Sequence, residues 1–217
     1  MADYAVVFDM DGVIFDSERC VMACWDEIAA RHNLGDFHPV FRACLGTTRK
    51  ESREIMRKMR GEDFPAEDFM AEASVIYQSR YAHGNLPLKP YVRELLGYLK
   101  ETGIPVVLAS STRRETVARE LTEAGLIDYF RALVCGDMVS KGKPDPEIYL
   151  LACQTLGTPP AEAFAIEDSF NGIRSASSAG LRTLMVPDLV EPTEEIRALC
   201  LEVFSSLREV LDYLKAM

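Results

Sequence analysis

The chain has 217 residues, of which 48% are hydrophobic and 27% charged, a composition typical of a globular protein and not of a disordered one. Its formal net charge of −10 argues against a nucleic-acid partner, because binding to a phosphate backbone needs a basic surface. The cysteines form no Cys-x-x-Cys pair, and the chain shows neither a secretory signal nor an apolar run of membrane-spanning length. We therefore expect a protein of the reducing cytoplasm with no membrane partner.

Short apolar runs alternate with segments of helical period through most of the chain. Such runs are typical of strands that are buried on both faces of a parallel sheet, so the alternation predicts an α/β core with helices on both faces. The predicted strands are Tyr4–Phe8, Pro105–Ala109, Ala132–Cys135, Ala163–Ile166 and Thr183–Val186, with Glu202–Phe204 as a further candidate. The predicted helices are Val92–Glu101, Arg114–Ala124, Pro146–Leu156, Asn171–Ala179 and Ser206–Lys215.

One stretch near the N-terminus breaks this alternation, because it contains helical patterns but no strand-like run. The clearest patterns are Glu18–Arg31, Thr48–Arg60 and Ala66–Tyr81. A strandless stretch of this length far exceeds an ordinary connection. We therefore expect an all-α insert at residues 17–84, placed between the first strand and the rest of a core formed by residues 1–16 and 85–217. An extra helical layer of the same domain is the alternative.

Polar side chains occur at the points where four of the predicted strands end. In an open parallel sheet the carboxyl ends of the strands meet at one edge, where functional groups gather. We therefore expect these side chains to converge on one site. In chain order they are Asp9 and Asp11, the run of Ser110, Ser111 and Thr112, then Lys141 and Lys143 in the loop after the third strand, and Glu167 and Asp168.

The four acidic residues of this set indicate a metal site. Carboxylates that are buried close together repel one another and either bind protons or recruit a cation. Mg²⁺ prefers oxygen ligands and needs only a few carboxylates besides phosphate and water. Asp9, Asp11, Glu167 and Asp168 are accordingly the candidate metal residues. A turn at Asp9 to Gly12 and a helix cap at Glu167 to Ser169 are the alternative explanations of the two pairs.

The spacing of Asp9 and Asp11 predicts a division of labour between two carboxylates on one side of a substrate. Asp9, in line with a phosphorus atom, would act as the nucleophile, and Asp11 would protonate the leaving group and later deprotonate a water molecule. Ser110 offers a hydroxyl, and Ser111 the backbone amide after it. Lys143 would place a positive charge on the transferring oxygens, and Lys141 is its alternative.

These residues lie in four motifs that resemble those of the haloacid dehalogenase-like hydrolase superfamily. The resemblance covers nearly the whole chain and implies a Rossmann-like fold, with Asp9 as nucleophile, Asp11 as acid and base, and Mg²⁺ as cofactor. It implies that Ser110 and Lys143 bind phosphate. It also implies that Asp9, the Asp11 carbonyl, Asp168 and Glu167 hold the metal. The motifs are Phe8-Asp9-Met10-Asp11-Gly12-Val13, Ser110, Gly142-Lys143-Pro144-Asp145-Pro146 and Ile166-Glu167-Asp168-Ser169-x-x-Gly172.

The helical insert resembles the cap of the subgroup that holds β-phosphoglucomutase and small sugar-phosphate phosphatases. The run Gly46-Thr47-Thr48-Arg49 resembles the cap loop whose Arg contacts the far phosphate of the substrate in the mutases, so Arg49 is a candidate substrate-binding residue. Those mutases also carry a His just past the hinge, where this chain reads Asp16-Ser17-Glu18-Arg19-Cys20-Val21. The histidines of the chain are His32, His38 and His83.

We therefore expect a monomeric phosphatase that acts on a small phosphorylated metabolite, such as a sugar phosphate, because a phosphatase needs only water as acceptor. A β-phosphoglucomutase-like sugar phosphomutase is the nearest alternative. A signalling receiver also groups acidic residues with a Lys, but its accepting Asp follows a middle strand. A catalytically silent binding protein on the same scaffold is the last alternative.

Overall fold

The computed structural model describes residues 4–45, 47 and 49–217. The chain divides into two compact units, of which the first comprises residues 1–16 and 88–217 and the second comprises residues 17–87. The predicted insert falls within the second unit, and its role as a cap remains a prediction. Thr48, predicted to begin a helix, lies outside the described residues. None of the helices described has the length and apolar composition needed to cross a bilayer.

The first unit contains a six-stranded sheet in the order β3-β2-β1-β4-β5-β6, with every pair of neighbours parallel. The central strands are buried along their whole length, which explains why they appear in the sequence as continuous apolar runs. The predicted α/β fold class is therefore confirmed. The strands are β1 (Ala5–Phe8), β2 (Val106–Ser110), β3 (Ala132–Cys135), β4 (Ala163–Glu167), β5 (Arg182–Met185) and β6 (Glu202–Val203).

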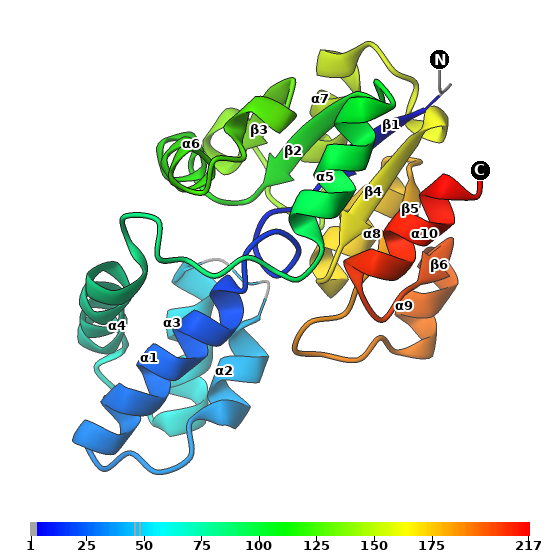
Figure 1. Cartoon of the computed structure of the whole chain (residues 1–217). Helices are drawn as coiled ribbons and strands as arrows, with labels where there is room; N and C mark the ends of the chain where they lie inside the picture. Colours follow the sequence, from blue (N-terminus) through cyan, green and yellow to red (C-terminus); the bar gives the residue numbers. More distant parts are fainter. Residues whose placement is uncertain (1–3, 46, 48) are drawn as a thin grey trace. The chain divides into compact units, whose positions relative to one another are not determined.

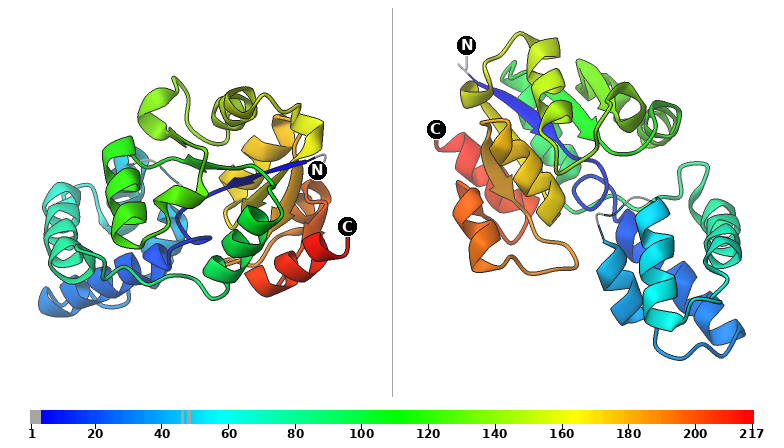
Figure 2. Two further views of the ribbon diagram at one scale, coloured as in Figure 1. Left: turned by 45° about the horizontal axis from the view of Figure 1, so that its top comes forward. Right: turned by 180° about the vertical axis from the view of Figure 1, so that it is seen from behind.

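Helices cover both faces of this sheet. Helices α5 and α10 pack against each other in front of the sheet in Figure 1, and α7 and α8 cover the opposite face in the right-hand view of Figure 2. Side chains of α7 join those of β1, β2 and β4 in one buried cluster, which includes Val7, Ala109, Tyr149 and Ala165. The helices are α5 (Val92–Glu101), α6 (Arg114–Glu123), α7 (Glu147–Leu156), α8 (Phe170–Ser178), α9 (Glu194–Leu199) and α10 (Leu207–Lys215).

The second unit consists of helices around an aromatic core. Phe37 and Phe69 stack with their ring centroids 4.6 Å apart, and Trp25 meets the edges of both Phe41 and Phe69 at 5.0 and 5.4 Å. Such offset and edge-to-face pairs stabilise a core beyond the area that they bury. The unit therefore has a hydrophobic core of its own. Its helices are α1 (Ser17–Arg31), α2 (His38–Cys44), α3 (Arg49–Arg60) and α4 (Ala66–Tyr81).

Truncation of Phe69 should destabilise this second unit. We expect Phe69→Ala to lower the free energy of unfolding by about 3–5 kcal/mol, because it leaves a cavity between Phe37 and Trp25. Trp25 is the only tryptophan of the chain, so its fluorescence during urea unfolding measures this core. Val75→Ala on the same helix is the control, since Val75 is 69% exposed and should change stability by less than about 0.5 kcal/mol. If Phe69→Ala and Val75→Ala lower the free energy of unfolding equally, this account of the core is contradicted.

Candidate active site

The predicted site lies at the carboxyl ends of three adjacent strands of the first unit. Strand β1 pairs with β2 on one side and with β4 on the other, so the three strands end side by side. Asp9 follows β1, and its backbone N–H still donates to the Ile166 carbonyl at 3.0 Å. Ser110 and Glu167, predicted to follow their strands, are instead the last residues of β2 and β4, because parallel pairing continues to them.

Lys143 is the centre of the buried polar cluster at this edge. Its ammonium donates to Asp9 Oδ1 and to Glu167 Oε1, each at 2.6 Å, and to the Ala109 carbonyl at 3.0 Å. The Lys143 side chain is only 6% exposed, and that of Glu167 is fully buried. Charge-assisted hydrogen bonds of this kind are about twice as strong as neutral ones, so they fix the ammonium in place.

The Glu167 carboxylate is hydrogen-bonded on both of its oxygens. Besides Lys143, the Tyr149 hydroxyl donates to Oε1 at 2.7 Å. On Oε2 the carboxylate accepts from the backbone amides of Asp168 and Ser169, at 3.1 and 3.2 Å, and from the Ser169 hydroxyl at 3.1 Å. Gly172 makes this close packing possible, because a Cβ there would lie 1.8 Å from Glu167 Oε1. The Glu167 side chain is therefore held from both sides.

A second close approach joins the loop after β1 to Asp168. Gly12 has a φ of +81°, and a Cβ on it would lie 2.1 Å from Asp168 Oδ2, so only glycine fits both the backbone and the space. Asp9, Glu167 and Asp168 each offer a carboxylate oxygen within 4.8 Å of the others, and all three residues are buried. Buried carboxylates gathered this closely repel one another, and their oxygens are the ligands that a hard divalent cation prefers.

Asp11 lies beside the loop that follows β2. The Thr112 hydroxyl donates to Asp11 Oδ2 at 2.9 Å, and the Thr112 amide donates to the Ser110 hydroxyl at 3.1 Å. Ser110 is fully buried, whereas the adjacent Ser111 is exposed. The loop thus holds a buried hydroxyl at the end of β2 and a second hydroxyl against Asp11.

The buried charges perturb one another. Burial raises the pKa of Asp9, the negative charges of Glu167 and Asp11 add to this rise, and the Lys143 ammonium opposes it. Burial alone would lower the pKa of Lys143, but the carboxylates of Asp9 and Glu167 raise it above its usual range. Lys143 is therefore held in its charged form, and further positive charge near Asp9 would favour the carboxylate of that residue.

The structure also separates residues that the sequence left as alternatives. Lys141 has a 72% exposed side chain whose ammonium lies 3.5 Å from Asp145, so it is Lys143 that contacts Asp9. Arg49 belongs to the second unit, where its guanidinium lies 3.4 Å from the Ser74 hydroxyl. Gly46 and Thr48 of the predicted substrate loop lie outside the described residues.

Two contacts at this edge were not predicted. Tyr149 is fully buried, donates to Glu167 and lies under the Lys143 ammonium, 5.0 Å from the ring centroid. In the sequence Tyr149 is only one apolar position of the predicted helix Pro146–Leu156. Thr112 was predicted only as a member of the hydroxyl run after the second strand, and its bond to Asp11 joins positions far apart in the chain. Neither contact has a local signal in the sequence.

Known proteins resemble this chain over most of its length. The sequence profile of the haloacid dehalogenase-like hydrolases matches residues 5–180. A phosphorylated carbohydrates phosphatase of Thermotoga maritima is 32% identical over 180 residues, which cover 83% of each chain. The beta-phosphoglucomutase of Bacillus subtilis is 33% identical over 183 residues, which cover 82% of this chain and 80% of the relative.

Among solved structures, mutant CbbY from Rhodobacter sphaeroides in complex with xylulose-(1,5)bisphosphate has a TM-score of 0.76 with this chain. It is 28% identical, and the alignment covers 96% of each chain. The order of the strands, the four motifs and these relatives agree with one another. The chain belongs to the haloacid dehalogenase-like hydrolase family and is an enzyme that acts on phosphate esters.

Proposed function

We propose that this enzyme is an Mg²⁺-dependent phosphatase that hydrolyses a small phosphorylated metabolite, in particular a sugar phosphate, through an aspartyl-phosphate intermediate. The observation that carries the proposal is the contact between Asp9 and Lys143 at 2.6 Å, with Asp11 two residues further along the same loop. A carboxylate nucleophile, a fixed cation and a second carboxylate are the groups that phosphoryl transfer through an aspartate requires.

In the proposed reaction the Asp9 carboxylate attacks phosphorus, and the bond from phosphorus to the ester oxygen breaks. Asp11 gives its proton to the leaving oxygen, so the alcohol departs neutral. Asp11 then takes a proton from water, which attacks phosphorus, releases inorganic phosphate and regenerates the Asp9 carboxylate. Lys143 and the hydroxyl of Ser110 would bind the phosphoryl oxygens throughout, with the backbone of Ser111 beside them.

The metal site of the proposal uses the acidic cluster at the same edge. Asp9, Asp168, the Asp11 carbonyl and Glu167 would hold Mg²⁺, with Glu167 the member whose oxygens already accept several hydrogen bonds. When bound, the metal would supply positive charge to the phosphoryl oxygens. The gathering of three buried carboxylates within reach of one ion supports this choice of ion.

Substrate selection is assigned to the second unit in this proposal, with residues 17–84 acting as the cap and Arg49 as a candidate contact to a second phosphate. A cap that closes over the substrate would exclude bulk water from the aspartyl-phosphate. The choice of a sugar phosphate is supported by the relatives, which include a phosphatase of phosphorylated carbohydrates and a protein solved in complex with xylulose-(1,5)bisphosphate. We further propose that the enzyme acts as a cytoplasmic monomer.

A sugar phosphomutase is the second candidate, and the 33% identity to a beta-phosphoglucomutase favours it. Against it, the segment Asp16 to Val21 lacks the hinge-side His expected for that activity. His32 and His38 of the second unit contact acidic side chains on its exposed surface, Glu72 and Asp26 respectively. We therefore favour the phosphatase over the mutase as the proposed function.

Glu120 on α6 adds a titratable group near the proposed acid and base. Burial raises the pKa of Glu120 to about 7, and the charge of Asp11 acts in the same direction, whereas the adjacent Arg119 opposes the rise. Only 11% of the Glu120 side chain is exposed, and its contact with Arg119 measures 3.5 Å. Protonated Glu120 is thus the favoured form in the folded enzyme below neutral pH.

Replacement of the nucleophile should abolish turnover. We expect Asp9→Asn to lower kcat for every phosphate ester by a factor on the order of 10³ or more, because an amide is a poor nucleophile. Phosphate release from a panel of sugar phosphates measures this, with Asp128→Asn as the control, since Asp128 is exposed on the surface of the same unit. Retained turnover in Asp9→Asn would overturn the mechanism.

Incubation with β-glucose 1-phosphate and a bisphosphate activator should separate the two candidate functions. We expect free phosphate to accumulate with Mg²⁺ present and its release to stop when a chelator is added, because water is the proposed acceptor. Isomerised hexose phosphate, detected by phosphorus NMR, would instead establish the mutase. Undiminished release of phosphate after chelation would contradict the proposed metal requirement.

Glu120 should make folding stability depend on pH. Since its folded pKa of about 7 exceeds the ordinary 4.5, its favourable contribution is complete at low pH and is lost as pH rises through 7. Glu120→Gln cannot ionise, so its stability relative to the wild type should increase between pH 4 and pH 8 by roughly 1–2 kcal/mol after solvent screening. Urea unfolding across this range measures the difference, with exposed Glu115→Gln on the same helix as the control. If the free energies of unfolding of the wild type and Glu120→Gln change in parallel with pH, the prediction is contradicted.

A further inference from the structure

Lys143 reaches the buried cluster from a loop that is largely exposed. The loop runs from Ser140 to Pro146, and Ser140, Lys141 and Pro144 are all exposed. Its lysine must nevertheless hold an ammonium 2.6 Å from both Asp9 and Glu167. A lysine side chain has a long flexible stem, so the position of its ammonium depends on how firmly the backbone beneath it is held.

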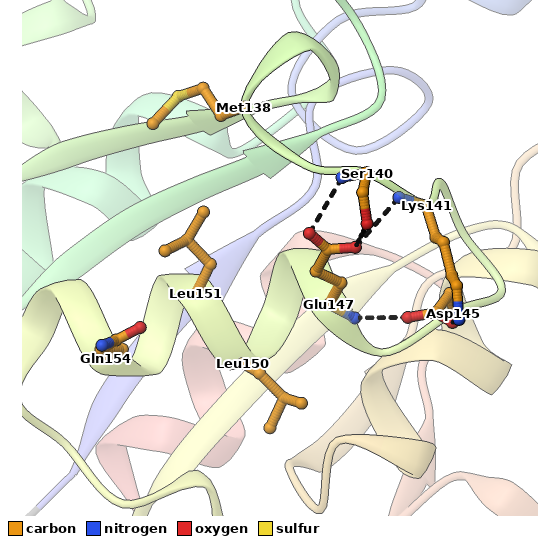
Figure 3. Close-up of a pocket in the computed structure, with 8 residues that line it drawn as sticks. All are labelled: Met138, Ser140, Lys141, Asp145, Glu147, Leu150, Leu151 and Gln154. Atoms are coloured by element: carbon orange, nitrogen blue, oxygen red, sulfur yellow. Dashed lines mark hydrogen bonds and ion pairs between the residues drawn. The ribbon is translucent and has the colours of Figure 1, made fainter.

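Glu147, the first residue of α7, closes this loop. Its carboxylate accepts from the Ser140 amide at 2.9 Å on Oε1, and from the Ser140 hydroxyl at 2.7 Å and the Lys141 amide at 2.9 Å on Oε2. Figure 3 shows the Glu147 side chain turned back from α7 toward the start of the loop, with dashed lines to both residues. One side chain therefore joins the two ends of the segment that carries Lys143.

Further hydrogen bonds attach the Lys143 loop to α7 and α8. The Glu147 amide donates to Asp145 Oδ1 at 3.1 Å, as the dashed line in Figure 3 also shows, and the Asp145 amide donates to the Gly142 carbonyl at 3.0 Å. The buried Ser175 of α8 donates its hydroxyl to the Asp145 carbonyl at 2.6 Å. The backbone on both sides of Lys143 is thereby tied to α7 and α8.

The same helix touches the active-site cluster directly. Tyr149 follows Glu147 by two residues on α7, and its hydroxyl donates to Glu167 at 2.7 Å. Because Tyr149 is fully buried, α7 cannot shift without disturbing Glu167. Glu147 thus connects the Lys143 loop to a helix whose position relative to the carboxylates is already determined.

We propose that Glu147 is a positioning residue for the phosphate site, which holds the loop of Lys143 so that the ammonium points at Asp9 and at the phosphoryl group. This inference rests on the proposed function, in which Lys143 binds phosphate. The hydrogen bonds from the Ser140 amide and hydroxyl lower the pKa of Glu147, so the carboxylate stays ionised at neutral pH.

Glu209 on α10 provides a matched control. Its carboxylate accepts from the Ser205 amide at 2.7 Å and the Ser205 hydroxyl at 2.8 Å, and these bonds lower its pKa in the same way. The chemistry of the two carboxylates is therefore alike, but within the described part of the chain no hydrogen bond or ion pair links Glu209 to the active-site cluster. A purely structural role would give Glu147 and Glu209 the same consequences on substitution.

The test compares Glu147→Ala with Glu209→Ala in the full-length enzyme with Mg²⁺. We expect similar small decreases in Tm for both variants. Glu147→Ala alone should weaken the binding of inorganic phosphate, measured by calorimetry, by about tenfold, and lower kcat/KM by about 10- to 100-fold, because small misplacements of a catalytic group are costly. Glu147→Gln keeps one acceptor oxygen, so its phosphate affinity and its kcat/KM should lie between those of the wild type and Glu147→Ala. Equal phosphate affinity in the two alanine variants would overturn the proposal.

A double-mutant cycle with Lys143→Ala then tests whether Glu147 acts through the lysine. If it does, Glu147→Ala should weaken phosphate binding no further in the Lys143→Ala background. An undiminished effect of Glu147→Ala in that background would overturn the positioning role. If Lys143→Ala by itself leaves phosphate binding unchanged, the proposed function fails at that residue, a result distinguishable from failure of Glu147 alone.

Discussion

The ammonium of Lys143 lies between the carboxylates of Asp9 and Glu167, and much of the first unit serves to keep it there. Burying any of these groups alone would cost several kcal/mol, since an unpaired charge loses its hydration. Each partner therefore depends on the others: Asp9 directly follows β1, Glu167 ends β4 and Lys143 lies in the loop before α7. The parallel order of the sheet matters because it brings these three segments to the same edge.

This arrangement gathers three buried carboxylates at one edge of the sheet, and their mutual repulsion connects the structure to its chemistry. The Lys143 ammonium contacts Asp9 and Glu167, and Glu167 also accepts neutral hydrogen bonds from Tyr149 and from the Asp168 amide. An anionic phosphate could not approach such a cluster unless further positive charge came with it. The proposed cation would supply positive charge locally in a chain whose net charge is −10.

The fold was predictable where local signals and tertiary burial agree. Strands such as β1 and β4 are buried on both faces, so they appear as continuous apolar runs with turn residues after them. Helices α5 and α4 match their predicted bounds, because each is long enough for its period to be recognised. Helix α9, with 6 residues, is too short to show a helical period, and the sequence did not predict it.

The site was predictable only in part, for a related reason. Asp9 directly follows a buried run and Lys143 lies within the Gly142-Lys143-Pro144 motif, so their positions call for a functional explanation. Glu147 and Tyr149 are not unusual, since an acidic residue suits the first turn of a helix and an aromatic ring suits its buried face. Their contacts with Ser140 and Glu167 join segments that periodicity does not relate. Where an ordinary structural role fully accounts for a residue in the sequence, only the three-dimensional contacts can reveal that it also acts on a catalytic group.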